Sequence, residues 1–462
     1  MGEELWKRSA TELAALISDG ELSSRAVVDA HLDRIEECNG AVNAITLVLA
    51  DEARAAADAI DGSSENAGVF AGVPFTVKNN IDLVGSPTTQ AIPAMAEAMP
   101  ILDAPQVERM KAAGAIPIAR TNLPEFGLRI TTEGPLHGTT SNPWNLALTA
   151  GGSSGGEAAA IATGMSPLGL GNDLGGSLRN PAFCCGISSL KPSSGRVPEA
   201  SSIEPSSPAL SLQQMAVQGP MARSVADLRA ALGVMAGPHP RSPLTVDTPL
   251  EGPSVPNRAA VVTSIPGVVI DEGVLVGVRA AAEALSAAGW EVEEVTPPEL
   301  ELVHELWARN LAFDVPVLAM ALEPIMSPEA LTLLMSLQNL YPPEALPPQV
   351  VHMERHRLMC AWTAFFTDYP VIIGPTWTGR PFAHGADVAE GGLELTSDLL
   401  RFITPANLLG LPAAHVTTGV DSDLPVGAQI VADRFREDLC LDAAEIVERH
   451  CGVQAPIDPV TT

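Results

Sequence analysis

Basic residues are scarce in this sequence of 462 residues. Lys and Arg number 26 against 55 Asp and Glu, which gives a formal net charge of −29 at pH 7. A surface this negative repels phosphate backbones and anionic lipid headgroups. We therefore expect no nucleic-acid partner and no membrane partner, and instead a neutral or cationic one.

Long apolar runs and ordered cysteine spacings are also lacking. No stretch of about 18 uncharged apolar residues occurs, so no transmembrane helix is predicted, and the first twenty residues do not have the pattern of a secretory signal. The six cysteines fit neither a disulfide framework nor zinc spacing. Cys184 and Cys185 stand in the apolar context PAFCCGI, which is typical of packed core thiols. A reducing cytoplasm is the simplest interpretation.

Metal and dinucleotide motifs are absent as well. His352 and His356 in HMERH have the spacing of two ligands on a helix, but the glutamate is not at the position that an HExxH zinc site requires. A charged helix face is the favoured interpretation. GLGNDLGG is rich in glycine but contains no GxGxxG. We expect neither a metal nor an organic cofactor.

The chain reads as one large domain. Apolar residues make up 46% and charged residues 18%, a globular balance. The pattern SATE before LAALI predicts a capped first helix. From residue 66 onward, helix and strand patterns alternate, which predicts an α/β fold, with a helical insertion at 300–366. We expect a helical segment (1–65), a core (66–236), a proline-rich connection (237–258) and a C-terminal α/β portion with a helical cap (259–462).

Three stretches carry the chemistry: GVPFTVKNNID (72–82), AGGSSGGEAAA (150–160) and GNDLGGSLRNPAFCCGISSLKPSSGRVP (171–198). The last two are glycine turns that bear serines, with Ser153 and Ser177 24 residues apart, and Lys78 lies 75 residues before Ser153. Small neighbours on one flank of Ser177 would let a substrate carbonyl approach both its hydroxyl and the adjacent backbone N–H groups.

With these motifs the chain resembles the amidase signature hydrolases. The resemblance covers roughly residues 5–450, including the tail NLLGLPAAHVTTG, and is strongest from 70 to 235. It implies a large mixed, twisted β-sheet flanked by helices on both faces. It also implies a nucleophile, a bridging serine that usually follows a cis peptide bond, a lysine base, an oxyanion hole of backbone N–H groups and supporting residues. In that order these are Ser177; Ser153; Lys78; Leu174, Gly175, Gly176 and Ser177 itself; and Asp173, Arg179 and Ser154, the last as a further partner of the lysine.

The chemistry of the residues agrees with this resemblance. A serine hydroxyl needs a partner that removes its proton, and no histidine lies between His137 and His239. A lysine can serve if it is neutral, which requires lowering its pKa from about 10.4 to about 7. Burial can achieve such a shift, and the apolar neighbours in VPFTVK are compatible with burial. Lys78 would then take the proton of Ser153 while Ser153 takes that of Ser177.

One position departs from the family pattern, and the substrate contacts are less specific. The family often has Asp after the lysine, whereas this chain has Asn79, which removes an anion that would favour the charged amine. The resemblance of EFGLRITTEGPLHG to a substrate loop makes some of its residues candidates for substrate binding, along with two others. These candidates are Gly127, Leu128, Asn172 and Trp377. Residues 198–215 are open to interpretation as a lid or as a plain surface loop.

We therefore expect a serine-dependent amidohydrolase that acts on uncharged aliphatic or aryl amides, anilides or carbamates (urethanes) through an acyl-enzyme, as a monomer or a homodimer. Two alternatives stay open. One is the glutaminase component of a tRNA-dependent amidotransferase, against which stands GRVPEAS where such members usually read GRVSRYG. The other is a catalytically silent binding protein on the same scaffold, against which stands the presence of all three relay residues.

Overall fold

The computed structural model describes residues 4–63, 68–204 and 206–460. Within these residues, eleven strands form one sheet in the order β1-β3-β2-β8-β10-β9-β14-β15-β13-β11-β12. The strands are β1 (Ile45–Val48), β3 (Ile116–Thr121), β2 (Pro74–Lys78), β8 (Leu168–Asp173), β10 (Val217–Ala222), β9 (Ser188–Lys191), β14 (Ala413–Asp421), β15 (Leu424–Ala432), β13 (Val371–Gly374), β11 (Arg258–Val261) and β12 (Glu291–Glu294). Parallel pairs stand at both ends of the sheet and antiparallel pairs join β8 to β13, so the sheet is mixed.

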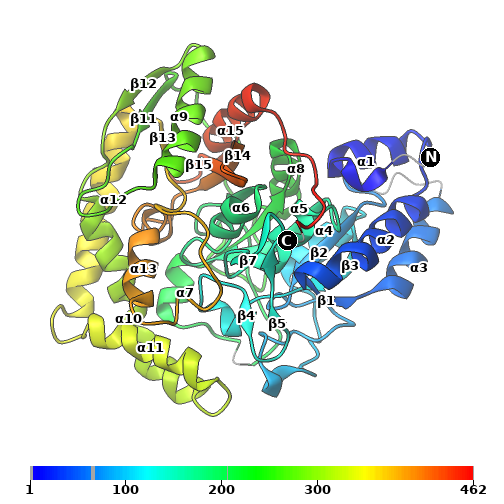
Figure 1. Cartoon of the computed structure of the whole chain (residues 1–462), viewed down its shortest axis with the longest axis horizontal. Coiled ribbons are helices and arrows are strands. Elements are labelled where there is room, and N and C mark those ends of the chain that lie inside the picture. The colour runs from blue at the N-terminus through cyan, green and yellow to red at the C-terminus, as the bar shows by residue number, and fades with distance from the viewer. Residues whose placement is uncertain (1–3, 64–67, 205, 461–462) are drawn as a thin grey trace.

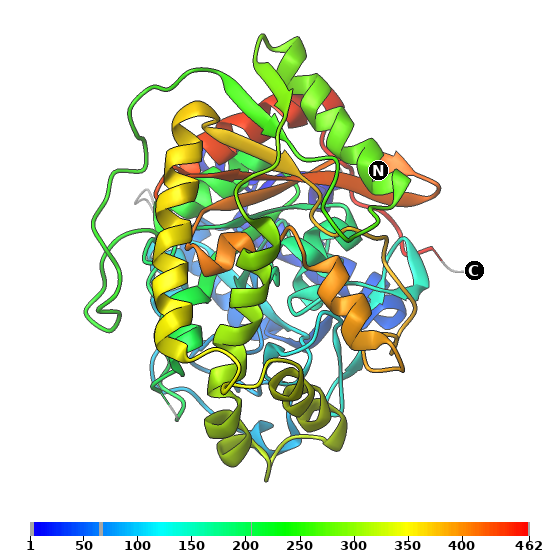
Figure 2. The ribbon, with the colours of Figure 1, turned by 90° about the vertical axis from the view of Figure 1, so that its left-hand side faces the viewer.

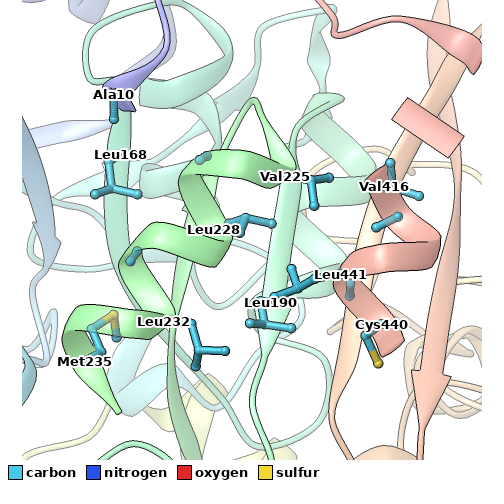
Figure 3. Close-up of a cluster of buried hydrophobic side chains, with 14 of the residues drawn as sticks. Ala10, Leu168, Leu190, Val225, Leu228, Leu232, Met235, Val416, Cys440 and Leu441 are labelled. Atoms are coloured by element: carbon cyan, nitrogen blue, oxygen red, sulfur yellow. The ribbon is translucent and has the colours of Figure 1, made fainter. Parts of the chain in front are cut away.

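Helices cover both faces of this sheet, as predicted (Figure 1). One face is covered by α4 (Pro105–Ala112), α8 (Val225–Met235), α9 (Glu272–Ala287) and α15 (Glu437–Cys451). Figure 3 shows how Leu228 and Leu232 of α8 lie over Leu190 of β9 and beside Leu441 of α15. The other face is covered by α5 (Gly155–Ala162) and α6 (Arg179–Cys185). Both helices are wholly buried, because apolar and small residues surround each of them on every side.

The N-terminal residues form helices on one side of the molecule (Figure 1). They are η1 (Leu5–Lys7), α1 (Ala10–Ser18), α2 (Ser24–Val42) and α3 (Ala50–Asp61). The Ser9 side chain accepts a hydrogen bond from the Glu12 N–H and the Glu12 side chain accepts one from the Ser9 N–H. The predicted capping box is therefore confirmed.

The predicted helical insertion lies on the opposite side, as Figure 2 shows. It comprises α10 (Leu300–Leu322), α11 (Pro328–Leu340) and α12 (Pro348–Asp368). The remaining helices are α7 (Leu210–Met215), α13 (Gly392–Leu399), α14 (Pro405–Leu408), η2 (Pro93–Met95) and η3 (Glu125–Gly127), and two small hairpins pair β4 (Glu133–Gly134) with β5 (Gly138–Thr139) and β6 (Ser141–Asn142) with β7 (Asn145–Thr149). None of the helices in the described ranges combines the length and the apolar character that crossing a bilayer requires.

Candidate active site

Two adjacent parallel strands bring the predicted lysine and aspartate to one edge of the sheet. Lys78 is the last residue of β2 and Asp173 is the last residue of β8. Thr76 of β2 pairs with Gly169 of β8 in parallel register. Because parallel strands end at the same edge, the two side chains lie at neighbouring positions there.

The Lys78 amine lies beside the hydroxyl of Ser153. Nζ is 2.7 Å from Ser153 Oγ and 2.7 Å from the Oδ1 atom of Asn172, its second hydrogen-bond partner. Lys78 is 0% exposed and Ser153 is 2% exposed. Burial lowers the pKa of Lys78 to about 7, although Asp173 and Glu157 act in the opposite direction. Half of the amine population is therefore uncharged at neutral pH.

The loops that carry Ser153 and Ser177 are joined directly. Ser153 lies in the turn before α5, and the peptide bond between Gly152 and Ser153 is cis. The Ser154 N–H donates to the carbonyl of Ser177 at 3.3 Å, and Ser177 is 8% exposed. Gly176, immediately before Ser177, has φ +101°, a conformation that L side chains rarely adopt.

A buried ion pair fixes the loop from β8 to α6. The guanidinium of Arg179 binds both oxygens of the Asp173 carboxylate, at 2.9 and 3.0 Å, and donates to Asn407 and Gln429. Asn407 also donates to Asp173 at 2.8 Å. Burial opposes ionisation, yet Arg179 holds the pKa of Asp173 far below its usual range. Both predicted supporting residues are thus placed beneath the Ser177 turn rather than within it.

The predicted oxyanion-hole residues differ in whether their N–H groups are free. The Gly176 N–H donates to Asp173 Oδ1 at 2.7 Å, so that group is already occupied. Leu174 and Gly175 are half-buried, and among the described residues no hydrogen bond involves either N–H group. The turn therefore presents Leu174, Gly175 and Ser177 as donors, whereas Gly176 holds the turn in shape.

Two sequence-based expectations need correction. The family resemblance predicts that Ser154 binds the lysine, but its Oγ atom is buried without a partner among the described residues, because Asn172 occupies that position on Lys78. Trp377 is predicted to contact substrate, yet it is 0% exposed and stacks at 5.6 Å on Phe382 in the core. Its ring packs between aromatic side chains and presents no surface.

The other candidate residues lie near the lysine and serine. Gly127 is close enough that a Cβ there would be 3.1 Å from Ser153 Oγ. Leu128 follows it at the end of η3 and is half-buried. Asn79, the departure from the family pattern, bonds through its amide to Thr46 and His137. Its side chain has no hydrogen bond to Lys78.

Two residues that sequence reasoning missed border this site. The side chains of Asn80 and Asn172 are hydrogen-bonded at 3.0 Å, and the position of Asn80, two residues after Lys78, was an available signal. Trp307 of α10 donates its indole N–H to the Leu174 carbonyl at 2.9 Å, and its ring lies against Gly175. Nothing in the sequence links Trp307 to Leu174, because 133 residues separate them.

The half-exposed side chains around the lysine and serines carry no charge. They are Asn80, Phe126, Leu128, Asn172, Leu174 and Trp307. Nearby Arg129 is paired with Asp387 at 2.7 Å. Within the described ranges, no group of three or more His, Cys, Asp or Glu side chains is arranged to hold a metal ion. The arrangement suits proton transfer between an amine and two hydroxyl groups.

The family model described as Amidase matches residues 26–441. The chain belongs to the amidase family. This amidase is 37% identical over 462 residues to an indoleacetamide hydrolase of Bradyrhizobium diazoefficiens, covering 98% of the chain and 88% of the relative. It is 33% identical to the GatA-type component of a glutamyl-tRNA(Gln) amidotransferase from Synechococcus sp. (strain WH7803), covering 95% and 96%. A solved bacterial aryl acylamidase of the amidase signature family superposes with a TM-score of 0.83 at 26% identity, covering 97% of each chain. The amidase is accordingly a hydrolase of amide C–N bonds, which confirms the predicted family, fold and enzyme class.

Proposed function

We propose that this amidase hydrolyses uncharged aliphatic or aryl amides, anilides or carbamates, with Ser177 as the nucleophile, Ser153 as the relay and Lys78 as the base. The observation that carries the proposal is the 2.7 Å approach of a wholly buried lysine amine to the Ser153 hydroxyl. A neutral amine in that position can accept a proton, whereas an ammonium group cannot. The pKa of about 7 for Lys78 supports the neutral form near physiological pH.

The reaction begins when Lys78 takes the proton of Ser153 and Ser153 takes that of Ser177. The Ser177 oxygen forms a bond to the carbonyl carbon, and the negative oxygen faces backbone N–H groups of the 174–177 turn. Each such donor typically lowers the barrier by about 3 to 4 kcal/mol. The C–N bond then breaks, and the relay run in reverse protonates the leaving nitrogen. Water, deprotonated through the same relay, attacks the acyl-enzyme and releases the acid.

The uncharged border of the site supports an uncharged substrate. Glutamine carries an ammonium and a carboxylate group, and its recognition calls for charged partners at hydrogen-bond distance. Arg129, the cation near the substrate loop, is already bound to Asp387 and Glu133. The similarity to the amidotransferase component therefore ranks second to the similarity to the indoleacetamide hydrolase as a guide to substrate.

The proposal is tested by hydrolysis of a primary arylacetamide, an anilide, an aryl carbamate and L-glutamine in the absence of any partner protein. We expect turnover of at least one of the first three and none of glutamine. Ser177→Ala should reduce kcat/KM by more than about 1,000-fold, and Lys78→Ala by about 100- to 10,000-fold.

Matched controls are available in the same chain. Ser189 of β9 is buried and its hydroxyl has no partner among the described residues, so Ser189→Ala should retain activity. Lys111 is an exposed lysine paired with Asp103, and Lys111→Ala should do the same. Near-normal rates in Ser177→Ala or Lys78→Ala would refute the relay, and failure of a serine-directed fluorophosphonate to label Ser177 would favour a silent binding protein.

A further inference from the structure

A carboxyl group lies buried behind Lys78, and the proposed reaction does not use it. Glu157 is the third residue of α5 and is 0% exposed. Its Oε1 atom accepts a hydrogen bond from the Thr121 hydroxyl at 2.8 Å, and its Oε2 atom accepts one from the Thr76 hydroxyl at 2.5 Å. No ion pair between Glu157 and a Lys, Arg or His side chain occurs within the described parts of the chain. A buried carboxyl without a cationic partner is costly to keep.

Both hydroxyl groups that hold Glu157 stand next to Lys78 in the sheet. Thr76 is two residues before Lys78 on β2, so the two side chains leave the same face of the strand. Thr121 of β3 is the register partner of Lys78. The carboxyl group is therefore fixed to the residue beside Lys78 along the strand and to the residue opposite it on the next strand.

The neighbouring strand keeps space for this carboxyl group. A Cβ atom at Gly169 of β8 would lie 2.1 Å from Glu157 Oε2, so even an alanine side chain would displace it. Gly169 pairs with Thr76 in the sheet. Three strands thus contribute to one pocket for a single carboxyl group behind the lysine.

The charges around this pair are few. Burial raises the pKa of Glu157 to about 7, against the effect of its two hydroxyl donors and of Lys78 and Arg120. Asp173 is the other charged group that acts on Lys78. The remaining titratable groups around α5 are at its C-terminal end or on α6. Arg223, Arg34 and His31 bind the carbonyls of residues 161, 163 and 164, and on α6 stand Arg179, bound to Asp173, and the thiols Cys184 and Cys185.

We propose that Glu157 is a positioning residue that controls the charge of Lys78, the two side chains titrating as one coupled pair. This inference rests on the proposed function, in which only the neutral amine is active. A Glu157 anion favours the Lys78 ammonium, so the negative charge delays the release of the proton from Lys78 as pH rises. The fold therefore sets the lower pH limit of activity with a group that does not touch substrate.

The test replaces Glu157 by glutamine, which retains the shape and an acceptor oxygen. The rate at which a fluorophosphonate labels Ser177 is measured across the acid limb, with kcat/KM on any substrate found. Glu157→Gln should move the midpoint of the acid limb to lower pH by about one unit, a tenfold gain in relative rate on that limb. An unchanged midpoint, or one moved to higher pH, would overturn the inference.

A matched control and a second variant complete the design. Glu448 of α15 is a partly buried carboxyl whose pKa burial also raises to about 7, but it binds the Val225 N–H, so Glu448→Gln should leave the midpoint in place. If Glu157→Gln does not fold, Thr76→Val removes one donor to the carboxylate and favours its neutral form, so the midpoint should also fall. Loss of labelling in Ser177→Ala and Lys78→Ala without a shift in Glu157→Gln would refute this inference alone.

Discussion

At the scale of single residues, Trp307 brings an aromatic ring to the border of the site from a distant helix. Its N–H bond to the Leu174 carbonyl and its stacking on His304, with ring centroids 6.0 Å apart and 23° between planes, hold the ring in one orientation. Burial lowers the pKa of His304 to about 3, so this neighbour is neutral. The ring thus offers a fixed apolar surface beside Gly175.

We expect Trp307→Ala to weaken the preference for aryl substrates. The kcat/KM ratio of an arylacetamide to acetamide should fall roughly tenfold, because lost contact with an aromatic group costs on the order of 1 to 2 kcal/mol. Trp307→Phe, which keeps a ring but loses the N–H donor, should retain most of the ratio. An equal loss on both substrates would mean that Trp307 supports the turn and does not contact the acyl group.

The residues that could be predicted from the sequence are those with a local signal. Lys78, Ser153 and Ser177 stand in glycine-rich or strand-ending motifs whose residue types already indicate the chemistry. The predictions for Ser154 and Trp377 are wrong because side-chain direction depends on neighbours that the sequence does not identify. Glu157 is visible in GGSSGGEAAA, but its two threonine partners belong to strands 36 and 81 residues away.

At the scale of elements, a buried carboxylate joins the helical insertion to the loop beside the site. Glu125 of η3 is 4% exposed and accepts hydrogen bonds from both the N–H and the hydroxyl of Ser327, the residue that caps α11. The Ser327 hydroxyl oxygen in turn accepts from the Ala330 N–H at 3.2 Å. The start of α11 is therefore attached to the segment that contains Gly127.

Removing this attachment should loosen the first turn of α11. In Glu125→Ala the Ser327 donors lose their acceptor, at a cost of about 1 to 3 kcal/mol. Hydrogen exchange of the amides around residues 327–331 should accelerate by roughly fivefold or more. Glu329→Ala, at an exposed position in the same turn, is the control and should change exchange there only slightly. Equal protection in Glu125→Ala and the wild type would contradict this view.

The existence of the helices and strands was predictable, whereas their pairing was not. Local periodicity and capping residues indicated α1, α2, α8, α9 and α15 and most strands of the C-terminal portion. The order β9-β14-β15-β13-β11 brings together residues from 188 to 432, and such long-range pairing depends on packing rather than on local pattern.

At the scale of the whole molecule, two buried lysines make stability depend on pH. Burial lowers the pKa of Lys191 to about 7, as it does for Lys78, and Lys191 Nζ donates to the carbonyls of Pro192 and Leu411. Both pKa values are depressed relative to the unfolded chain, in which lysine titrates near 10.4. Between pH 7 and pH 10 the unfolded chain therefore binds more protons, and the free energy of unfolding rises with pH.

We expect Lys191→Met to flatten this dependence. Each such lysine contributes a slope of about 1.4 kcal/mol per pH unit just above pH 7.5, and the variant should lose close to that amount between about pH 7.5 and pH 8.5. Urea unfolding at several pH values measures the slope, with Lys111→Met as the exposed control. An identical slope in Lys191→Met and the wild type would show that Lys191 keeps its proton in the folded state.

The clamp on Arg179 has a consequence for how the enzyme is made. Arg179 depends on the Ile403 carbonyl, on Asn407 and on Gln429, the last of which lies 250 residues further along the chain. A ribosome adding about 5 to 20 residues per second needs roughly 12 to 50 seconds to reach that point. Throughout that interval the emerging polypeptide holds the proposed nucleophile on an unsecured turn, so cleavage of cellular amides starts only when translation is nearly complete.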